Sequence, residues 1–150
     1  MSGAAADDAV SSGAAAATRM VARLRDVCID ANDPQRVGAF WGAVLGREPE
    51  DDGQGDGTTP DVYLAAGADG APRIFVNGVP EPKTGKARLH LDVTLEPGHE
   101  VSDLLALGAT VVTAPDEVRW WVLADPEGNE FCAFPPETDA TNDADAEVPA

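Results

Sequence analysis

The sequence predicts an α+β fold made of two copies of one unit, a strand followed by a helix and three more strands. Two observations support this prediction. Alternating apolar and polar residues indicate a strand in LRDVCID and another in RLHLDVTL. Each of these strands leads into a segment with helical apolar spacing, and three short segments with strand character follow each helix. A chain of 150 residues has the length of one domain with its own core.

The first helix is expected in DPQRVGAFWGAVLG, directly after the strand LRDVCID. Asp33 can cap its amino terminus, Pro34 suits the first helical position, and Gly46 suits the residue after the last turn. Apolar residues recur at the spacing of a helix face that packs on a sheet, at Val37, Phe40, Trp41, Val44 and Leu45. Three short strands are expected next, around residues 47–49, 61–65 and 72–77.

The same order is expected again from residue 88. RLHLDVTL predicts a strand with Leu89, Leu91 and Val93 on its buried face. EVSDLLALG predicts a helix that ends at Gly108, with Val101, Leu104 and Leu105 on one face. ATVVT, RWWVLA and NEFCAF predict the last three strands, and DPEGNE has turn-forming residues between the last two.

Both ends of the chain have the composition of disordered tails. Residues 1–18 are almost wholly Ala, Ser, Gly and Asp, and residues 137–150 carry five acidic residues and no basic one. The folded domain is therefore expected over residues 19–136, with one module at about 23–77 and a second at about 88–135, joined by a proline-rich linker.

The charge of the chain excludes some partners. There are 27 acidic and 10 basic residues, and the net charge of −17 should repel nucleic acid and anionic membranes. No segment approaches the roughly 20 apolar residues of a membrane span, and the amino terminus lacks the apolar stretch of a secretory signal. With two cysteines and no export signal, we expect free thiols and a cytoplasmic location.

Polar side chains are expected on the sheet faces that the helices leave open. Aligning the two strand–helix junctions pairs Asp26 with His90, and Cys28 with Asp92. One of Trp120 and Trp121 also faces this side; the pattern leaves open which, and Trp121 is taken as the candidate. The predicted ligand-binding residues of the resulting groove are Asp26, Cys28, Phe75, Asn77, His90, Asp92, Trp121, Cys132 and Phe134.

His90 is the candidate catalytic residue, with three interpretations. It could ligate a metal, act as a general base oriented by Asp26 or Asp92, or line the groove without taking part in chemistry. The apolar neighbours of Cys132 favour a buried small residue over a nucleophile.

Four segments of the chain are VCIDANDPQRVGAFWGAVLG, VPEPKTGKARLHLDV, LLALGATV and ADPEGNEFCAF. Together they resemble the glyoxalase/bleomycin-resistance/dioxygenase superfamily, also called the vicinal oxygen chelate (VOC) superfamily, and within it the glyoxalase-like domains. The resemblance covers residues 22–135. It implies two βαβββ modules that form a cup-shaped mixed sheet, with the helices on the outer face and the ligand inside the cup.

Metal-using members of this superfamily carry ligands at four strand positions, usually histidine, glutamate or glutamine. The resemblance places these positions at Asp26, Asn77, His90 and Cys132, and only His90 matches the pattern. We therefore expect no resident cofactor. If a divalent metal binds, Asp26, His90 and Cys132 would hold it, and the thiol suits zinc or iron better than magnesium or manganese.

Two functions remain open at this point. The chain resembles a small-molecule-binding member of the superfamily that lacks a full catalytic metal site. The alternative is an enzyme, a metal-dependent or His90-based lyase, isomerase or dioxygenase that acts on an oxygenated small molecule. The cup could close within one chain or across a homodimer.

Overall fold

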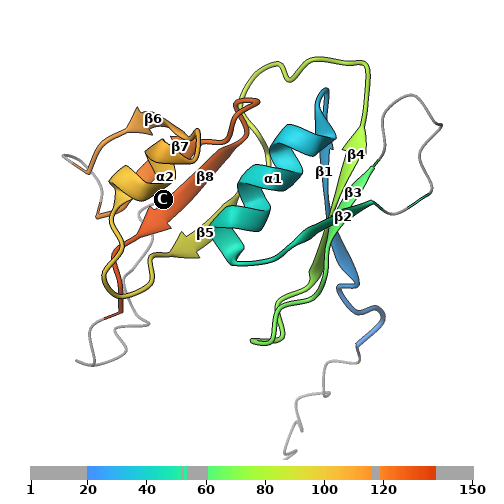
Figure 1. Ribbon diagram of the computed structural model, residues 1–150, viewed down its shortest axis with the longest axis horizontal. Helices are drawn as coiled ribbons and strands as arrows, with labels where there is room; N and C mark the ends of the chain where they lie inside the picture. Colours follow the sequence, from blue (N-terminus) through green and yellow to red (C-terminus); the bar gives the residue numbers. More distant parts are fainter. Residues whose placement is uncertain (1–19, 52, 54–60, 116–118, 138–150) are drawn as a thin grey trace, which may run out of the picture.

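The computed structural model describes residues 20–51, 53, 61–115 and 119–137, and the predicted strand–helix–three-strand order occurs in both halves (Figure 1). The first module consists of β1 (Asp26–Ala31), α1 (Pro34–Leu45), β2 (Pro49–Asp51), β3 (Val62–Leu64) and β4 (Arg73–Gly78). The second consists of β5 (Leu91–Thr94), α2 (Val101–Ala106), β6 (Thr110–Thr113), β7 (Trp121–Ala124) and β8 (Glu130–Phe134). Of the predicted tails, 1–18 and 137–150, all residues except Glu137 lie outside the described residues.

Each module forms its own four-stranded mixed sheet. The strand order is β1-β4-β3-β2 in the first sheet and β5-β8-β7-β6 in the second. In both sheets the first strand of the module runs parallel to the last, and the other neighbours are antiparallel. The predicted α+β class and the repeated βαβββ module are therefore confirmed.

Helix α1 begins and ends where the sequence predicts. The Asp33 side chain accepts a hydrogen bond from the Arg36 backbone N–H (3.1 Å), Pro34 occupies the first turn, and Gly46 has a left-handed φ of 62° after the last turn. Gly38 lets the helix approach the sheet closely, since a Cβ atom there would lie 2.6 Å from Cγ1 of Val62.

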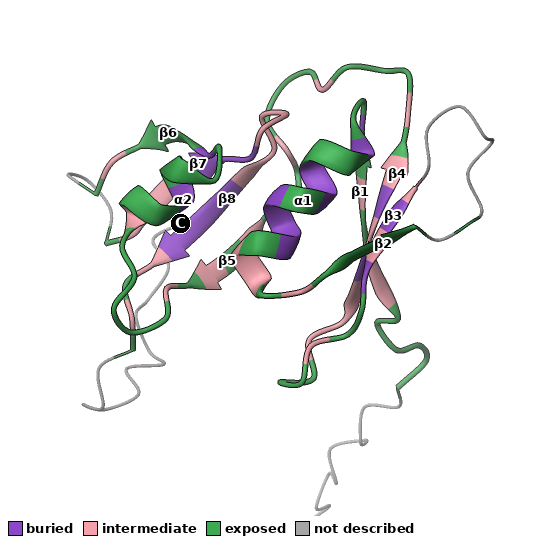
Figure 2. Ribbon diagram, viewed as in Figure 1, coloured by how far each residue is buried: buried purple, intermediate pink, exposed green. Residues whose placement is uncertain are grey.

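Helix α1 lies between the two sheets and contributes to the core of both modules (Figure 1). On one side it packs on β3 and β4 of its own sheet. On the other side, the ring centroids of Phe40 and Trp41 lie 5.9 and 5.1 Å from that of Phe131 on β8. Figure 2 shows buried positions on α1, on β8 and on the strands of the first sheet. The apolar faces of both sheets therefore meet α1, and the opposite faces are open to solvent.

Polar contacts also join the two modules. The Trp41 indole N–H donates to the carboxylate of Asp125 (3.2 Å), which is 2% exposed and sits in the turn before β8. The Glu127 carboxylate of the same turn accepts hydrogen bonds from the backbone N–H groups of Asn32 and Asp33 (2.8 and 2.6 Å). The DPEGNE turn thus also fixes the second module against the start of α1.

The second module departs from the prediction at two points. A bend at Arg88 and Leu89 delays the start of β5 to Leu91, and Leu89 is 91% exposed. The prediction that Leu89 lies on the buried face with Leu91 and Val93 is wrong. Apolar and polar residues alternate in the sequence through positions 88 and 89, but the chain bends there and is not yet a strand. Helix α2 has six residues; Leu104 is buried, whereas Leu105 is 39% exposed. No helix in the described ranges is long and apolar enough to cross a bilayer.

Candidate functional site

The predicted groove residues are divided between two surfaces. We call the polar side of β1, β3 and β4 the first open face, and the polar side of β5 and β8 the second open face. The first open face carries Asp26, Cys28, Phe75 and Asn77, and the second carries His90, Asp92, Cys132 and Phe134. Because both sheets turn their apolar sides to α1, the two open faces point away from each other. A single chain therefore does not bring these residues into one groove, and of the two alternatives for the cup, closure across a homodimer stays a prediction.

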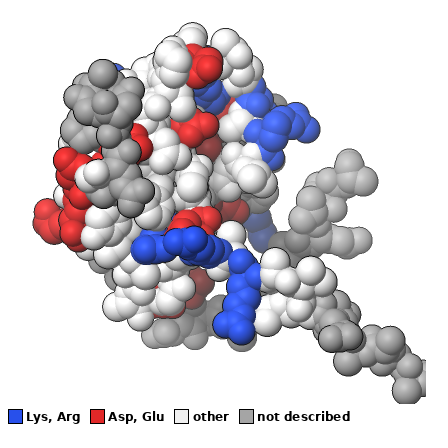
Figure 3. All heavy atoms as spheres, turned by 90° about the vertical axis from the view of Figure 1, so that its right-hand side faces the viewer, with Lys and Arg blue, Asp and Glu red and all other residues white. Residues whose placement is uncertain are grey.

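On the first open face, Asp26 is held by arginine side chains. Arg73 donates from Nε and Nη2 to the two oxygens of Asp26 (2.9 and 3.2 Å), and Arg25 Nε lies 3.1 Å from Oδ2. The Arg73 guanidinium also lies over the ring of Phe75, with Cζ 5.4 Å from the centroid. In the space-filling view of this side, basic and acidic side chains lie next to one another among uncharged ones (Figure 3). A cation at Asp26 would have to compete with two guanidinium groups.

Phe75, and not Asn77, stands at the position on β4 that corresponds to Cys132. The strand register pairs Cys28 with Phe75 in the first module and Asp92 with Cys132 in the second. Asn77 lies two residues further along and pairs with Asp30, to which its amide donates at 3.4 Å. The assignment of Asn77 to this position is therefore shifted by two residues, and a phenylalanine offers no donor atom to a metal.

An aromatic pair also lies on the first open face. The rings of Tyr63 and Phe75 stack with centroids 5.8 Å apart and planes inclined by 26°. The Tyr63 hydroxyl donates to Glu50 (2.8 Å), and this hydrogen bond raises the pKa of the tyrosine. Together with the guanidinium of Arg73, these rings form a flat surface with polar edges.

The second open face brings three potential ligand residues together, His90, Asp92 and Cys132. One ligand atom from each lies within 4.8 Å of the others, and His90 Nε2 is 3.2 Å from Asp92 Oδ1. Burial and the neighbouring Asp92 carboxylate raise the pKa of the Cys132 thiol. The raised pKa disfavours the thiolate, the form in which a cysteine acts as a nucleophile or binds a metal.

The structure places Trp120 on the second open face and Trp121 on the opposite side. Trp121 pairs with Ala133 of β8 and packs on the apolar core, whereas Trp120 stacks on Phe134 with centroids 5.4 Å apart. The choice of Trp121 as the exposed tryptophan is therefore corrected to Trp120. Cys132 and Phe134 alternate with Ala133, so the residue paired with Ala133 must face the helices.

The linker is tied to the second sheet beside this face. Lys83 Nζ lies 3.0 Å from Glu130 Oε2, and the backbone N–H of Ala87 donates to the same oxygen (3.0 Å). The backbone hydrogen bonds and Lys83 lower the pKa of Glu130 to about 2. Of the basic linker residues, Lys83 is engaged in this way, whereas Lys86 and Arg88 are exposed.

The donor atoms do not match the four-ligand metal site that the resemblance implies. Asp26 is neutralised by arginines, Phe75 has no donor, and only His90 and Cys132 stand at corresponding positions of the second module. His90, Asp92 and Cys132 form a different set of three, drawn from one module. Such a set suits zinc or iron rather than manganese, and only once the thiol is deprotonated.

Two residues of the open faces were not predicted from the sequence: Arg73 and Tyr63. Arg73 and Phe75 alternate with the buried Ile74 in the strand RIFVN, so the pattern already placed Arg73 on the open face. Tyr63 lies between the buried residues Val62 and Leu64, which gives the same signal.

The sequence matches a protein-family model over most of the domain. Residues 26–134 match the glyoxalase-like domain. No curated protein sequence matches the chain significantly.

Several solved structures share the fold. A glyoxalase/bleomycin resistance protein/dioxygenase family enzyme from Burkholderia phytofirmans PsJN has a TM-score of 0.57 at 24% identity, over 77% of this chain and 100% of that one. The fosfomycin resistance protein FosX from Mesorhizobium loti has a TM-score of 0.59 at 12% identity, over 77% and 92%. A FosX mutant from Listeria monocytogenes, solved with Mn(II) and 1S,2S-dihydroxypropylphosphonic acid, has a TM-score of 0.59 at 13% identity, over 80% and 94%. At these identities the likeness concerns the fold. The chain belongs to the glyoxalase-like domain family, with the VOC fold.

Proposed function

We propose that this protein binds a small molecule between the first open face of one copy and the second open face of another, without a full catalytic metal site. One observation carries the proposal. Each open face holds a stacked aromatic pair beside polar groups, Tyr63–Phe75 on the first and Trp120–Phe134 on the second. A planar molecule held between two such pairs would contact ring surfaces on both sides.

A second copy is needed because the two faces point apart in one chain. Their charges are complementary. The first open face and its β2 edge carry the carboxylates of Asp26, Asp30 and Glu50 and the guanidinium groups of Arg25 and Arg73, one more negative than positive charge. The second face carries Asp92, and the linker beside it adds the exposed Lys86 and Arg88, one more positive than negative charge. Opposite charges on two surfaces favour their association and fix their relative orientation. The proposed assembly is a homodimer with two equivalent sites.

The donor set supports binding over metal chemistry. The residues at the first-module positions, Asp26 and Phe75, offer one carboxylate already paired with Arg73 and one ring. The Listeria FosX structure contains Mn(II) together with a small phosphonic acid, which supports a small-molecule site on this fold. The pattern of donors in this chain supports a ligand held by stacking and hydrogen bonds.

An enzyme is the second candidate, and the observation that favours it is the His90–Asp92–Cys132 cluster. Asp92 lies close enough to orient His90 as a general base, and the three side chains together could hold zinc or iron. The activity would then be that of a lyase, isomerase or dioxygenase acting on an oxygenated small molecule.

Metal content separates the two candidates. The purified protein is expected to contain zinc, iron and nickel well below one ion per chain by elemental analysis. One bound ion per chain, lost in His90→Ala and kept in the control variant His99→Ala, would establish the enzyme candidate instead. His99 is a suitable control because it pairs with Asp103 on α2, away from the cluster.

Association and ligand binding test the proposed site itself. Sedimentation should show a dimer that the charge reversal Lys86→Glu/Arg88→Glu weakens at least tenfold, while Arg36→Glu on α1 leaves it intact. A thermal-shift screen with planar aromatic compounds, cationic ones included, should then find ligands whose stabilisation is lost in Phe75→Ala. A chain that remains monomeric at every concentration, or ligands that bind Phe75→Ala as well as the wild type, would contradict the proposal.

A further inference from the structure

A cavity of about 1010 Å³ lies between the two modules, on the helix-facing sides of both sheets and away from the open faces. It arises where α1 ends at Leu45. Apolar residues of both sheets line it, and residues of the six-residue helix α2 form part of its wall. Its size matches sites that take one small organic molecule.

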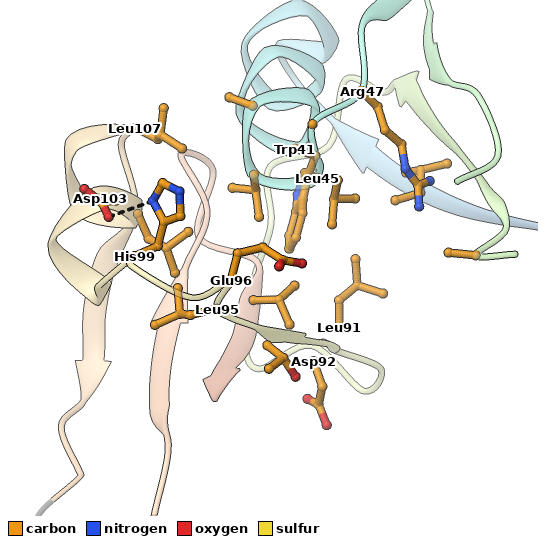
Figure 4. Close-up of a pocket in the computed structure, with 18 of the residues that line it drawn as sticks. Trp41, Leu45, Arg47, Leu91, Asp92, Leu95, Glu96, His99, Asp103 and Leu107 are labelled. Atoms are coloured by element: carbon orange, nitrogen blue, oxygen red, sulfur yellow. Dashed lines mark hydrogen bonds and ion pairs between the residues drawn. The ribbon is translucent and has the colours of Figure 1, made fainter. Parts of the chain in front are cut away.

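The wall of the cavity is mainly apolar. Val27 and Ile74 come from the first sheet, Leu91 and Val93 from the second, and Leu45 from α1. Val27, Leu91, Val93 and Leu45 are only partly buried, so an apolar ligand would remove further apolar surface from water. Figure 4 shows Leu45, Leu91 and Leu95 around the space below Trp41.

Carboxylates outnumber basic groups at the rim. The charged and titratable rim residues are Arg47, Asp69, Asp92, Glu96, His99 and Asp103. Most of them have partners: Asp92 lies beside His90, Asp103 pairs with His99, and Arg47 donates to the carbonyls of Ala65 and Pro72. Asp69 accepts a hydrogen bond from the backbone N–H of Ala71.

Glu96 differs from the other rim residues. Its side chain has no hydrogen bond or ion pair with any described residue, and this exposed side chain points toward Trp41 (Figure 4). A negative charge placed over apolar walls, without a counter-charge of its own, is complementary to a ligand that joins an apolar body to a positive group.

We propose that this cavity is a second binding site, specific for a small amphiphilic organic cation. The apolar part of the ligand packs on Leu45, Leu91 and Leu95, and its positive group pairs with Glu96. This site is separate from the proposed ligand site on the open faces, because its apolar wall lies on the helix-facing sides of the sheets; Asp92 is the one residue named in both.

Three probes of equal chain length test the charge preference: octyltrimethylammonium, octanol and octanoate, each well below its micelle-forming concentration. Titration calorimetry on the full chain should show the ammonium compound binding at least tenfold more tightly than octanoate, with octanol between them. Glu96→Gln should reduce the affinity for the ammonium compound to that for octanol. The matched control is Glu81→Gln, an exposed glutamate of the linker, and it should change nothing.

Filling the cavity tests the location. Leu45→Trp should lower the affinity for the ammonium probe at least tenfold, whereas Leu105→Trp, an exposed leucine outside the cavity wall, should leave it unchanged. Phe75→Ala should bind the probe like the wild type, which separates this site from the open faces. Circular dichroism checks that each variant is folded. If Leu45→Trp does not fold, Glu96→Gln still tests the proposal.

Three results would overturn the proposal. The first is octanoate binding as tightly as the ammonium compound, which would remove the role of Glu96. The second is a folded Leu45→Trp variant with wild-type affinity, which would place the probe elsewhere. The third is a gain of more than tenfold in the affinity for the ammonium compound when residues 1–19 are removed. Such a gain would mean that this segment of the chain competes with the probe for the cavity.

Discussion

Replacing Asp125 by asparagine tests how strongly one buried carboxylate holds the two modules together. One oxygen of Asp125 accepts from the backbone N–H groups of Glu127 and Asn129 (2.9 and 3.0 Å). The other accepts from the Trp41 indole (3.2 Å) and the Asn129 side-chain amide (2.9 Å). The substituted amide would keep one acceptor oxygen and turn an NH₂ group toward two N–H donors.

The expected cost follows from these contacts. Two hydrogen bonds to a charged acceptor are lost at a site that is 2% exposed. At about 1.5 kcal/mol each, the free energy of unfolding should fall by about 3 kcal/mol. This is a large part of the total for a domain, which is about 5–15 kcal/mol.

Urea unfolding followed by tryptophan fluorescence and circular dichroism measures the change, with the slope m unchanged if unfolding remains two-state. Asp30→Asn is the matched control: it makes the same change in charge at an exposed residue with one long hydrogen bond, so it should cost less than about 0.5 kcal/mol. In a Trp41→Phe background, Asp125→Asn should cost about 1 kcal/mol less, because one donor is already gone. A cost of Asp125→Asn equal to that of Asp30→Asn would refute the reasoning.

Three further predictions concern the packing and the polar contacts. Gly38→Ala should destabilise the protein by about 1–2 kcal/mol in urea unfolding, because the clash with Val62 outweighs the gain of about 1 kcal/mol in helix propensity. Glu127→Gln should lower the unfolding free energy by about 1–3 kcal/mol, since it weakens two charge-assisted bonds to the backbone at the start of α1. Folding lowers the pKa of Glu130 from 4.5 to about 2, so the stability that its ionised carboxylate contributes is present above pH 4.5 and is lost as the pH falls toward 2. Melting temperatures should therefore depend less on pH over this range in Glu130→Gln, and also in a variant in which both Glu130 and Lys83 are replaced.

The parts of this fold that local chemistry determines could be predicted from the sequence. Asp33, Pro34 and Gly46 fix the ends of α1 through contacts within a few residues, and the structure has the helix where they place it. The alternation in β1 and β4 likewise assigned Asp26 and Phe75 to the open side.

The failures concern long-range geometry. A shift of two residues along a strand leaves every side chain on the same face, so alternation could not distinguish Phe75 from Asn77 as the counterpart of Cys132. The choice between Trp120 and Trp121 needed the register of β7 against β8, which the sequence pattern does not contain. The relative orientation of the two sheets depends on which residues of the second sheet pack against Phe40 and Trp41 of α1. The residue pattern within one sheet does not predict this contact.

The shared position of α1 also determines how the chain can be divided. A fragment that ended in the linker would retain α1 with Phe40 and Trp41 exposed on one side. A fragment that began there would have only the six residues of α2 to shield β8. The two modules have the same strand order, yet they are unequal in folding, because the first supplies a helix on which the second depends. We therefore expect the smallest cooperative folding unit to be the pair of modules, so that neither half of the repeat folds alone.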